Sequence, residues 1–460
     1  MARILVGRLL WLLELEVCGP VARQRLRQLR DGRGTARLQP GDRRRKAILA
    51  VGIIVNLLVL GYFKYADFFI ANFNSILSAH IGALRLILPL GISFFTFTEI
   101  AFLVDSSKGK AAEYSFLNYI LFITFFPQLI AGPIVHHKEM MPQFAQLRSK
   151  ILNWGNLSHG AFQFSIGLAK KVIVADMFAV WANNGFANAG ALNCVEAWAA
   201  SLSFTLQLYF DFSGYTDMAM GLARMFNIRL PRNFNSPYKA LNIQDFWKRW
   251  HMTLSRFLRD YVYIPLGGNR KGKFRTYLNV LLTFVIGGFW HGAGWTFVLW
   301  GFLHGAANVT HRLWEGTHLR LGRALAWVAT FGFVNVLWVF FRAKTLPDAV
   351  GVLRAMAGSN GVILPAAMGR ILPFLKPLGV DYSGQYLSKI LGTQTGILAN
   401  SIVVVPVILV FLVITALAPN SDELTERFKP SGLTLVFAVV LFVVSILSMN
   451  RVSEFIYFNF

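Results

Sequence analysis

Two histidines in the middle of the chain each follow a tryptophan, and they are the first residues to consider for chemistry. His251 closes the sequence Phe-Trp-Lys-Arg-Trp-His, and His291 lies in Phe-Trp-His-Gly forty positions later. A histidine can take or give a proton near neutral pH, and burial among apolar groups keeps it neutral, as a general base requires. We therefore expect His291 to be a general base. A core histidine that bonds a neighbouring carbonyl group is the alternative.

The residues beside His291 suit a place that another group approaches closely. Glycine allows such an approach because it has no side chain, and four glycines flank this histidine: Gly287, Gly288, Gly292 and Gly294. They leave room for another backbone or for a ligand. Trp290 and Trp295 are expected to form the walls of a slot on either side of the imidazole.

His251 lies in a segment whose pattern predicts an amphipathic helix. Between Asp245 and Tyr263 the apolar residues recur at spacings of three and four, and basic residues occupy the opposite face. Such a helix lies along a membrane surface. His251 falls at the edge of the apolar stripe, where interfacial packing is the commoner role and a functional one the alternative. His304, four residues after Trp300, is a third candidate.

Two groups of charged residues fall among apolar ones. Asp211 and Asp217 belong to the stretch 207–217 between apolar segments, where a polar cluster faces a cavity or a partner rather than lipid. A functional cavity is the favoured interpretation, and a structural network is the alternative. Lys170 and Lys171 are interpreted as lysines whose ammonium groups extend to the membrane surface.

Motifs for several other chemistries are missing from the sequence. It has no His-Glu-x-x-His pattern, no Gly-x-Ser-x-Gly turn, no phosphate-binding loop, and only two cysteines, Cys18 and Cys194. We therefore expect no metal site and no protein nucleophile. Direct attack by a substrate hydroxyl, assisted by a histidine base, is the simplest scheme.

The composition indicates an all-α integral membrane protein. Of 460 residues 55% are hydrophobic and only 15% are charged, and the mean hydropathy is +0.50. A soluble domain carries about 25% charged residues. The net charge of +23 would suit a nucleic-acid-binding protein, but in so apolar a chain it is better explained by cytoplasmic loops rich in Lys and Arg.

Runs of apolar residues divide the chain into a basic N-terminal segment, 1–46, and one membrane domain, 47–460. The N-terminal segment is expected to contain a short interfacial helix, and a poor membrane span is the alternative. We expect nine or ten membrane-crossing helices and at least one interfacial or re-entrant helix. The predicted apolar segments are 47–65, 81–104, 115–135, 160–181, 191–210, 276–290, 295–314, 324–341, 398–417 and 433–449.

Two of these segments contain residues that disturb a helix. Segment 81–104 has possible kink points at Pro89 and Gly91. Segment 115–135 ends in Phe-Phe-Pro-Gln-Leu-Ile-Ala-Gly-Pro, which cannot continue a regular helix, so this backbone must line protein or a water-filled cavity. The His-His pair at 136–137 is expected in a polar loop.

Several motifs, taken in order, resemble the membrane-bound O-acyltransferase family, and in particular its branch that acetylates bacterial exopolysaccharides such as alginate. The D-alanyl teichoic-acid transferases are a more distant resemblance. The motifs are those at 88–97, 126–133, 167–172, 209–217, 246–251, 259–268, 289–292 and 338–342. Together they extend the resemblance over residues 47–460.

The resemblance implies a fold, a reaction and a set of site residues. The fold is a ring of membrane helices around a thinned central core in the bacterial cytoplasmic (inner) membrane. The reaction takes an acetyl group from a cytosolic thioester, acetyl-CoA, to an extracytoplasmic polysaccharide, with a periplasmic serine-esterase-like acetyltransferase as partner. His291 is implied as the catalytic residue and His251 as a required one. Residues expected to bind the donor are Trp250, Arg249, Tyr209, Asp211 and Trp290.

Two functions of other classes stay open at this point. One is a secondary transporter in which Glu99, Asp211 and Asp217 bind a cation, although the paired broken helices typical of such proteins are not visible. The other is a non-catalytic membrane subunit of a polysaccharide export assembly.

Overall fold

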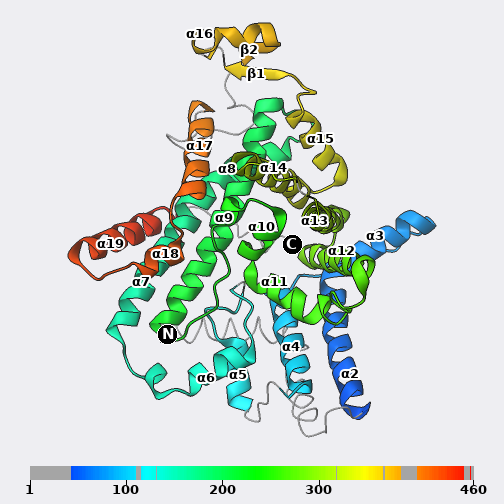
Figure 1. Cartoon of the computed structure of the whole chain (residues 1–460), viewed down its shortest axis with the longest axis vertical. Coiled ribbons are helices and arrows are strands. Elements are labelled where there is room, and N and C mark those ends of the chain that lie inside the picture. The colour runs from blue at the N-terminus through cyan, green and yellow to red at the C-terminus, as the bar shows by residue number, and fades with distance from the viewer. Residues whose placement is uncertain are drawn as a thin grey trace. The chain divides into compact units, whose positions relative to one another are not determined.

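The computed structural model describes residues 43–109, 116–130, 132–317, 319–365, 368–384, 401–449 and 456. These residues are mostly helical (Figure 1), and they divide into two compact units. The first unit contains the described residues up to Asn153 together with Phe226–Pro231, and the second contains the rest. Most of the basic segment 1–46 lies outside the described residues.

The first unit consists of short and medium helices. They are α2 (Arg43–Leu60), the π-helical turn η1 (Gly61–Tyr65), α3 (Ala66–Leu77), α4 (Ile92–Ser107), α5 (Phe116–Thr124), α6 (His137–Ala145) and the 3-10 turn η2 (Leu147–Lys150). α2, η1 and α3 follow one another without a break, and α2 packs against α4. The predicted crossing segment 47–65 is therefore part of one longer helical run.

The prediction of one helix over 81–104 is wrong in its first half. Residues 79–91 form no helix, and α4 begins only after them. Pro89 has no backbone N–H to donate, while Arg85 and Gly91 adopt positive φ angles of 50° and 71°. A right-handed helix cannot pass through such residues.

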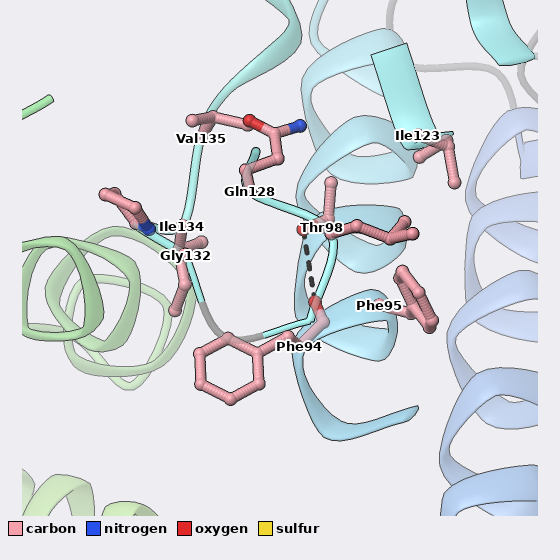
Figure 2. Close-up of a pocket in the computed structure, with 10 residues that line it drawn as sticks. Phe94, Phe95, Thr98, Ile123, Gln128, Gly132, Ile134 and Val135 are labelled. Atoms are coloured by element: carbon pink, nitrogen blue, oxygen red, sulfur yellow. Dashed lines mark hydrogen bonds between the residues drawn. The ribbon is translucent and has the colours of Figure 1, made fainter. Parts of the chain in front are cut away.

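The predicted break at the end of segment 115–135 is confirmed. α5 ends at Thr124, and the backbone that follows passes so close to itself that a Cβ at Gly132 would lie 2.5 Å from the Cα of Gln128. This non-helical backbone and α4 line a small pocket (Figure 2). The residues labelled there are Phe94, Phe95, Thr98, Ile123, Gln128, Gly132, Ile134 and Val135.

The expectation of a polar loop at His136 and His137 is wrong, because both side chains are buried. The Nδ1 atom of His136 lies 3.7 Å from a carboxylate oxygen of Asp105. The ring of His137, the first residue of α6, packs at 5.3 Å from the rings of Phe102 and Phe122. The start of α6 thus packs against α4 and α5, and its histidines are taken out of solvent.

The second unit contains the longest helices. Its N-terminal part comprises α7 (Trp154–Ala169), the π-helical turn η3 (Lys170–Ala175), α8 (Asp176–Ala187), α9 (Cys194–Met225), η4 (Pro237–Lys239), α10 (Ile243–Arg249), α11 (Met252–Leu258), η5 (Arg259–Tyr263), α12 (Gly272–His291), α13 (Trp295–Trp314), α14 (Arg323–Arg342) and α15 (Leu346–Met356). Its C-terminal part comprises β1 (Val362–Pro365), α16 (Met368–Ile371), η6 (Pro373–Leu378), β2 (Val380–Gly384), α17 (Ser401–Leu417), α18 (Ser421–Glu426) and α19 (Gly432–Leu447).

Helix α9 is central to this unit, with α7, α8, α14, α15 and α17 packed against it (Figure 1). Twenty-two of its 32 residues are buried, so it forms the middle of the hydrophobic core. The polar stretch 207–217 lies inside this helix and not between two segments, which corrects the predicted boundary at 210. The strands β1 and β2 pair in parallel and are the exception to the helical fold among the described residues.

Two glycine pairs bring α7 and α9 into backbone contact. A Cβ at Gly160 would lie 2.5 Å from the carbonyl oxygen of Gly221, and one at Gly167 would lie 2.6 Å from that of Gly214. Within each helix the two glycines are seven residues apart, so they share one face. The close approach of the two backbones therefore depends on the missing side chains.

Replacing Gly167 by alanine should destabilise the fold. The new methyl group overlaps the backbone of α9, and overpacking of this kind costs about 1–3 kcal/mol. We expect a lower melting temperature of the protein in detergent. Gly332→Ala in α14 is the matched control, because a Cβ there meets nothing within 4 Å. A melting temperature equal to that of the control would contradict this account of the α7–α9 contact.

Glycines on either side of His291 serve a similar purpose. A Cβ at Gly288 would lie 2.9 Å from the Cα of Gly301, and one at Gly292 would overlap the ring of Phe297. α12 and α13 thus form a tight helical hairpin. The glycines near His291 were expected to leave room either for another backbone or for a ligand. At Gly288 and Gly292 the space is taken by neighbouring parts of the protein.

Two helical runs among the described residues are long and apolar enough to cross a membrane by length and composition. They are Arg43–Leu77 and Arg323–Arg342, and Val404–Leu417 and Gly432–Leu447 are shorter apolar helices. The bounds predicted for 295–314 and 324–341 agree with α13 and α14 to within one residue. The predicted number of crossings and the ring arrangement stay predictions.

Candidate functional site

The continuous helix predicted over 245–263 is broken at His251. α10 begins at an asparagine cap, where the Asn242 side chain accepts the N–H of Asp245 at 2.7 Å, and α11 begins at Met252. Between them His251 has φ 44° and ψ 52°, in the left-handed region. A residue other than glycine in this region is unusual and is strained unless its surroundings hold it there.

Asn233 holds this turn from the loop that follows α9. Its side-chain oxygen accepts the backbone N–H of Thr253 at 3.2 Å and the hydroxyl of the same residue at 2.8 Å. The Nδ1 atom of His251 lies 3.2 Å from the same oxygen, and the backbone N–H of Met252 donates to the Asn233 carbonyl at 2.9 Å. The left-handed turn is therefore maintained by contacts with a residue far away in sequence.

The turn places His251 beside His291. Their ring centroids are 6.4 Å apart, and both side chains are buried, with exposed fractions of 0% and 5%. The ring of Phe212 packs edge-on against His251 at 4.7 Å. Burial lowers the pKa of His251 to about 3, so this histidine is neutral at physiological pH. The expectation that it lies at the edge of an interfacial stripe is corrected, because it is in the core.

Aromatic rings surround His291, but one of the predicted walls is wrong. Trp290 contacts it edge-on at 4.9 Å, as expected. Trp295 is instead 56% exposed, because it is the first residue of α13. The other rings come from Trp300 at 5.3 Å and Phe341 at 5.2 Å.

His304 is fully buried and is paired with a tryptophan. The indole N–H of Trp247 donates to its Nδ1 atom at 3.2 Å. Trp300 lies between His304 and His291, with ring centroids at 4.7 Å and 5.3 Å. His304 therefore anchors α10 to α13, and it is a less direct candidate for a base than His291.

The residues predicted to bind the donor separate into different environments. Tyr209 and Trp250 share an aromatic cluster with centroids 6.4 Å apart, while Trp290 lies against His291. Arg249 bonds the carboxylate of Asp245 at 2.8 Å on the same helix. Their assignment to donor binding stays a prediction.

Asp211 belongs to a buried charge network and not to the aromatic cluster. The ammonium group of Lys171 lies 2.7 Å from Asp211 and 3.1 Å from Asp176, and that of Lys170 lies 2.6 Å from Asp217. The interpretation of these lysines as extending to the membrane surface is wrong. Of the two interpretations of the aspartates, this geometry favours the structural network, because buried charges are stable only when paired.

Removing Asp217 alone should destabilise the protein more than removing it together with Lys170, its partner at 2.6 Å. Breaking a buried ion pair by deleting one partner costs about 3–5 kcal/mol, whereas an apolar pair of similar size is often tolerated. We therefore expect Asp217→Leu to lower the melting temperature, and Lys170→Met in addition to restore part of it. Equal loss in the single and double variants would contradict the pairing.

Sequence reasoning did not identify three residues of this site: Asn233, Trp300 and Phe341. Trp300 and Phe341 belong to helices that were predicted, but no spacing rule relates them to His291. Asn233 stands between Pro231 and Pro237 in the sequence, a setting that indicates only a turn. Among the described residues no group of three or more His, Cys, Asp or Glu side chains is placed to hold a metal ion.

The structure thus places two buried histidines side by side in a mostly helical, apolar protein. The sequence matches the membrane-bound O-acyltransferase family over residues 95–346, which includes His251, His291 and His304. The chain belongs to this family, and it is a membrane protein.

Similar proteins with known names come from the branch that modifies cell-envelope polymers. A peptidoglycan O-acetyltransferase of Helicobacter pylori is 52% identical over 345 residues, covering 69% of this chain and 66% of the relative. A probable alginate O-acetylase AlgI of Azotobacter vinelandii is 41% identical, covering 71% and 65%. A teichoic acid D-alanyltransferase of Bacillus subtilis is 32% identical, covering 45% and 55%. The chain thus spans slightly under two thirds of the length of the first two.

Proposed function

We propose that this protein moves an acetyl group from acetyl-CoA on the cytosolic side of the bacterial inner membrane toward hydroxyl groups of an extracytoplasmic polysaccharide. Peptidoglycan and alginate-like polymers are the acceptor classes that the named relatives suggest. The observation that carries the proposal is the pair of buried histidines, 6.4 Å apart, inside the region that matches the family.

In the proposed reaction His291 is the general base. Its imidazole takes the proton of the attacking hydroxyl as the hydroxyl oxygen bonds to the thioester carbonyl carbon. The carbon–sulfur bond then breaks, and the CoA thiolate leaves and receives the proton from the imidazolium. A positioned base of this kind contributes about 10²–10⁴-fold to the rate.

Two features of the site support this assignment. The rings of Trp290, Trp300 and Phe341 bury His291, so that only 5% of it is exposed to solvent. His251 lies close enough to act on the same substrates, either by positioning the donor or by polarising its carbonyl group. The acceptor hydroxyl belongs either to the glycan itself or to a periplasmic serine-esterase-like partner that passes the acetyl group on.

The test is acetyl transfer by the purified protein in lipid nanodiscs. Acetyl-CoA labelled in the acetyl group is supplied with a soluble glycan fragment, and the label is followed into the glycan or into water as free acetate. We expect transfer or hydrolysis that depends on His291. The proposed function would be refuted if the protein neither binds acetyl-CoA nor releases CoA from it under these conditions.

A further inference from the structure

Asn233 is a buried residue for which the proposed reaction has no role. It has an exposed fraction of 0% and lies in the loop between α9 and η4. Through its side-chain oxygen and its carbonyl group it contacts three consecutive residues of the turn: His251, Met252 and Thr253. Three of these contacts meet at the side-chain oxygen.

These hydrogen bonds determine which nitrogen of His251 carries a hydrogen. A backbone N–H can only donate, so the Asn233 atom that faces the N–H of Thr253 must be the amide oxygen and not the nitrogen. The same oxygen faces the Nδ1 atom of His251 at 3.2 Å, so Nδ1 must donate. A neutral imidazole carries one hydrogen, and Nε2 therefore presents a lone pair.

We propose that Asn233 is a positioning residue that holds His251 as the tautomer with hydrogen on Nδ1, so that Nε2 accepts a hydrogen bond from the bound substrates. The inference rests on the proposed function and narrows it. A neutral Nε2 without hydrogen cannot donate to the thioester carbonyl oxygen, so polarisation of that carbonyl is excluded. It accepts a hydrogen bond from a hydroxyl or an amide N–H of the acceptor or donor.

The surroundings of His251 keep this tautomer neutral. Among the described residues, His291 of α12 and the apolar ring of Phe212 of α9 pack against it. The charged residues of α10 nearest in sequence, Asp245 and Arg249, are paired with each other at 2.8 Å. The hydrogen on Nδ1 thus follows from the bond to Asn233.

The tautomer can be measured without any substrate. Nitrogen-15 NMR of the histidine-labelled protein distinguishes a ring nitrogen that carries hydrogen from one that does not, and comparison with His251→Gln assigns the signals. We expect hydrogen on Nδ1 in the wild type and a mixture of tautomers in Asn233→Leu. Hydrogen on Nε2 in the wild type would overturn the proposal.

The pH dependence of acetyl transfer gives a second readout. Asn233→Asp keeps the acceptor oxygens but adds a negative charge that favours the imidazolium, so the acidic limb of kcat/KM should move to higher pH by about one unit or more. Asn233→Leu should lower kcat by about tenfold or more at every pH, as changes behind a functional histidine do.

The matched control is Asn308→Asp. Asn308 is also a buried asparagine of this unit, but its amide donates to the carbonyl of His304 at 2.9 Å, and the acidic limb should stay in place. If the acidic limb of kcat/KM in Asn233→Asp stays at its wild-type pH, the proposal is overturned. The Asn233→Asp variant therefore tests the proposal even if Asn233→Leu does not fold. Absence of transfer by the wild type would instead refute the proposed function, while the NMR result would still decide the tautomer.

Discussion

Replacing His291 by alanine should abolish acetyl transfer while the protein stays folded and binds acetyl-CoA. Without the imidazole no base removes the proton from the attacking hydroxyl, and the rate of transfer should fall by about 10²–10⁴-fold. The side chain packs against Trp290, Trp300 and Phe341. Transfer rate and acetyl-CoA affinity are measured on the same purified preparation.

His311→Ala is the matched control for this experiment. His311 lies near the end of α13, where its Nε2 atom is 3.4 Å from a carboxylate oxygen of the exposed Glu315. It should keep both activity and binding. Transfer by His291→Ala at a rate close to that of the control would refute the proposed mechanism and make His251 or His304 the candidate base.

Replacing His251 should also remove most of the activity, and it should in addition weaken the binding of acetyl-CoA. We expect this of both His251→Ala and His251→Gly, because each lacks the imidazole that lies 6.4 Å from His291. The loss should again be on the order of 10²-fold or more. The two variants differ in the backbone. Alanine in the left-handed region costs about 1–2 kcal/mol, whereas glycine adopts it freely.

Comparing the two variants separates the role of the ring from that of the turn. Melting temperatures should place His251→Gly above His251→Ala, while transfer is lost in both. Near wild-type transfer by His251→Gly would show that the turn matters and the imidazole does not. A loss of activity without any change in acetyl-CoA affinity would instead restrict His251 to the acceptor side of the reaction.

Elements with a strong local signal could be predicted from the sequence. α13 and α14 were predicted to within one residue, because long apolar runs bounded by glycine or charge have few other stable conformations in lipid. The irregular backbone around Gly132 was predicted for the same kind of reason, since two prolines and a glycine stop a helix locally. In segment 81–104 only kinks were predicted, at Pro89 and Gly91, whereas the positive φ angles at Arg85 and Gly91 exclude a helix from the whole first half.

The amphipathic segment at 245–263 shows where local reasoning ends. Its apolar stripe correctly predicts a helix on either side of His251. The same spacing of apolar residues is found with or without a turn between the two helices, so it does not reveal the turn. The turn exists because Asn233 bonds three of its residues, and that contact spans 18 residues. Helical periodicity carries no information about such a partner.

The sequence by itself determined the family, the apolar helical character and the two histidines, because each rests on residue types and on spacings within a short stretch. Only the tertiary structure decided that Lys171 pairs with Asp211, that Trp300 and not Trp295 packs on His291, and that Asn233 bonds His251. The reason is physical. Burial and hydrogen bonding depend on which side chains meet when distant segments pack, whereas composition and periodicity describe each segment alone.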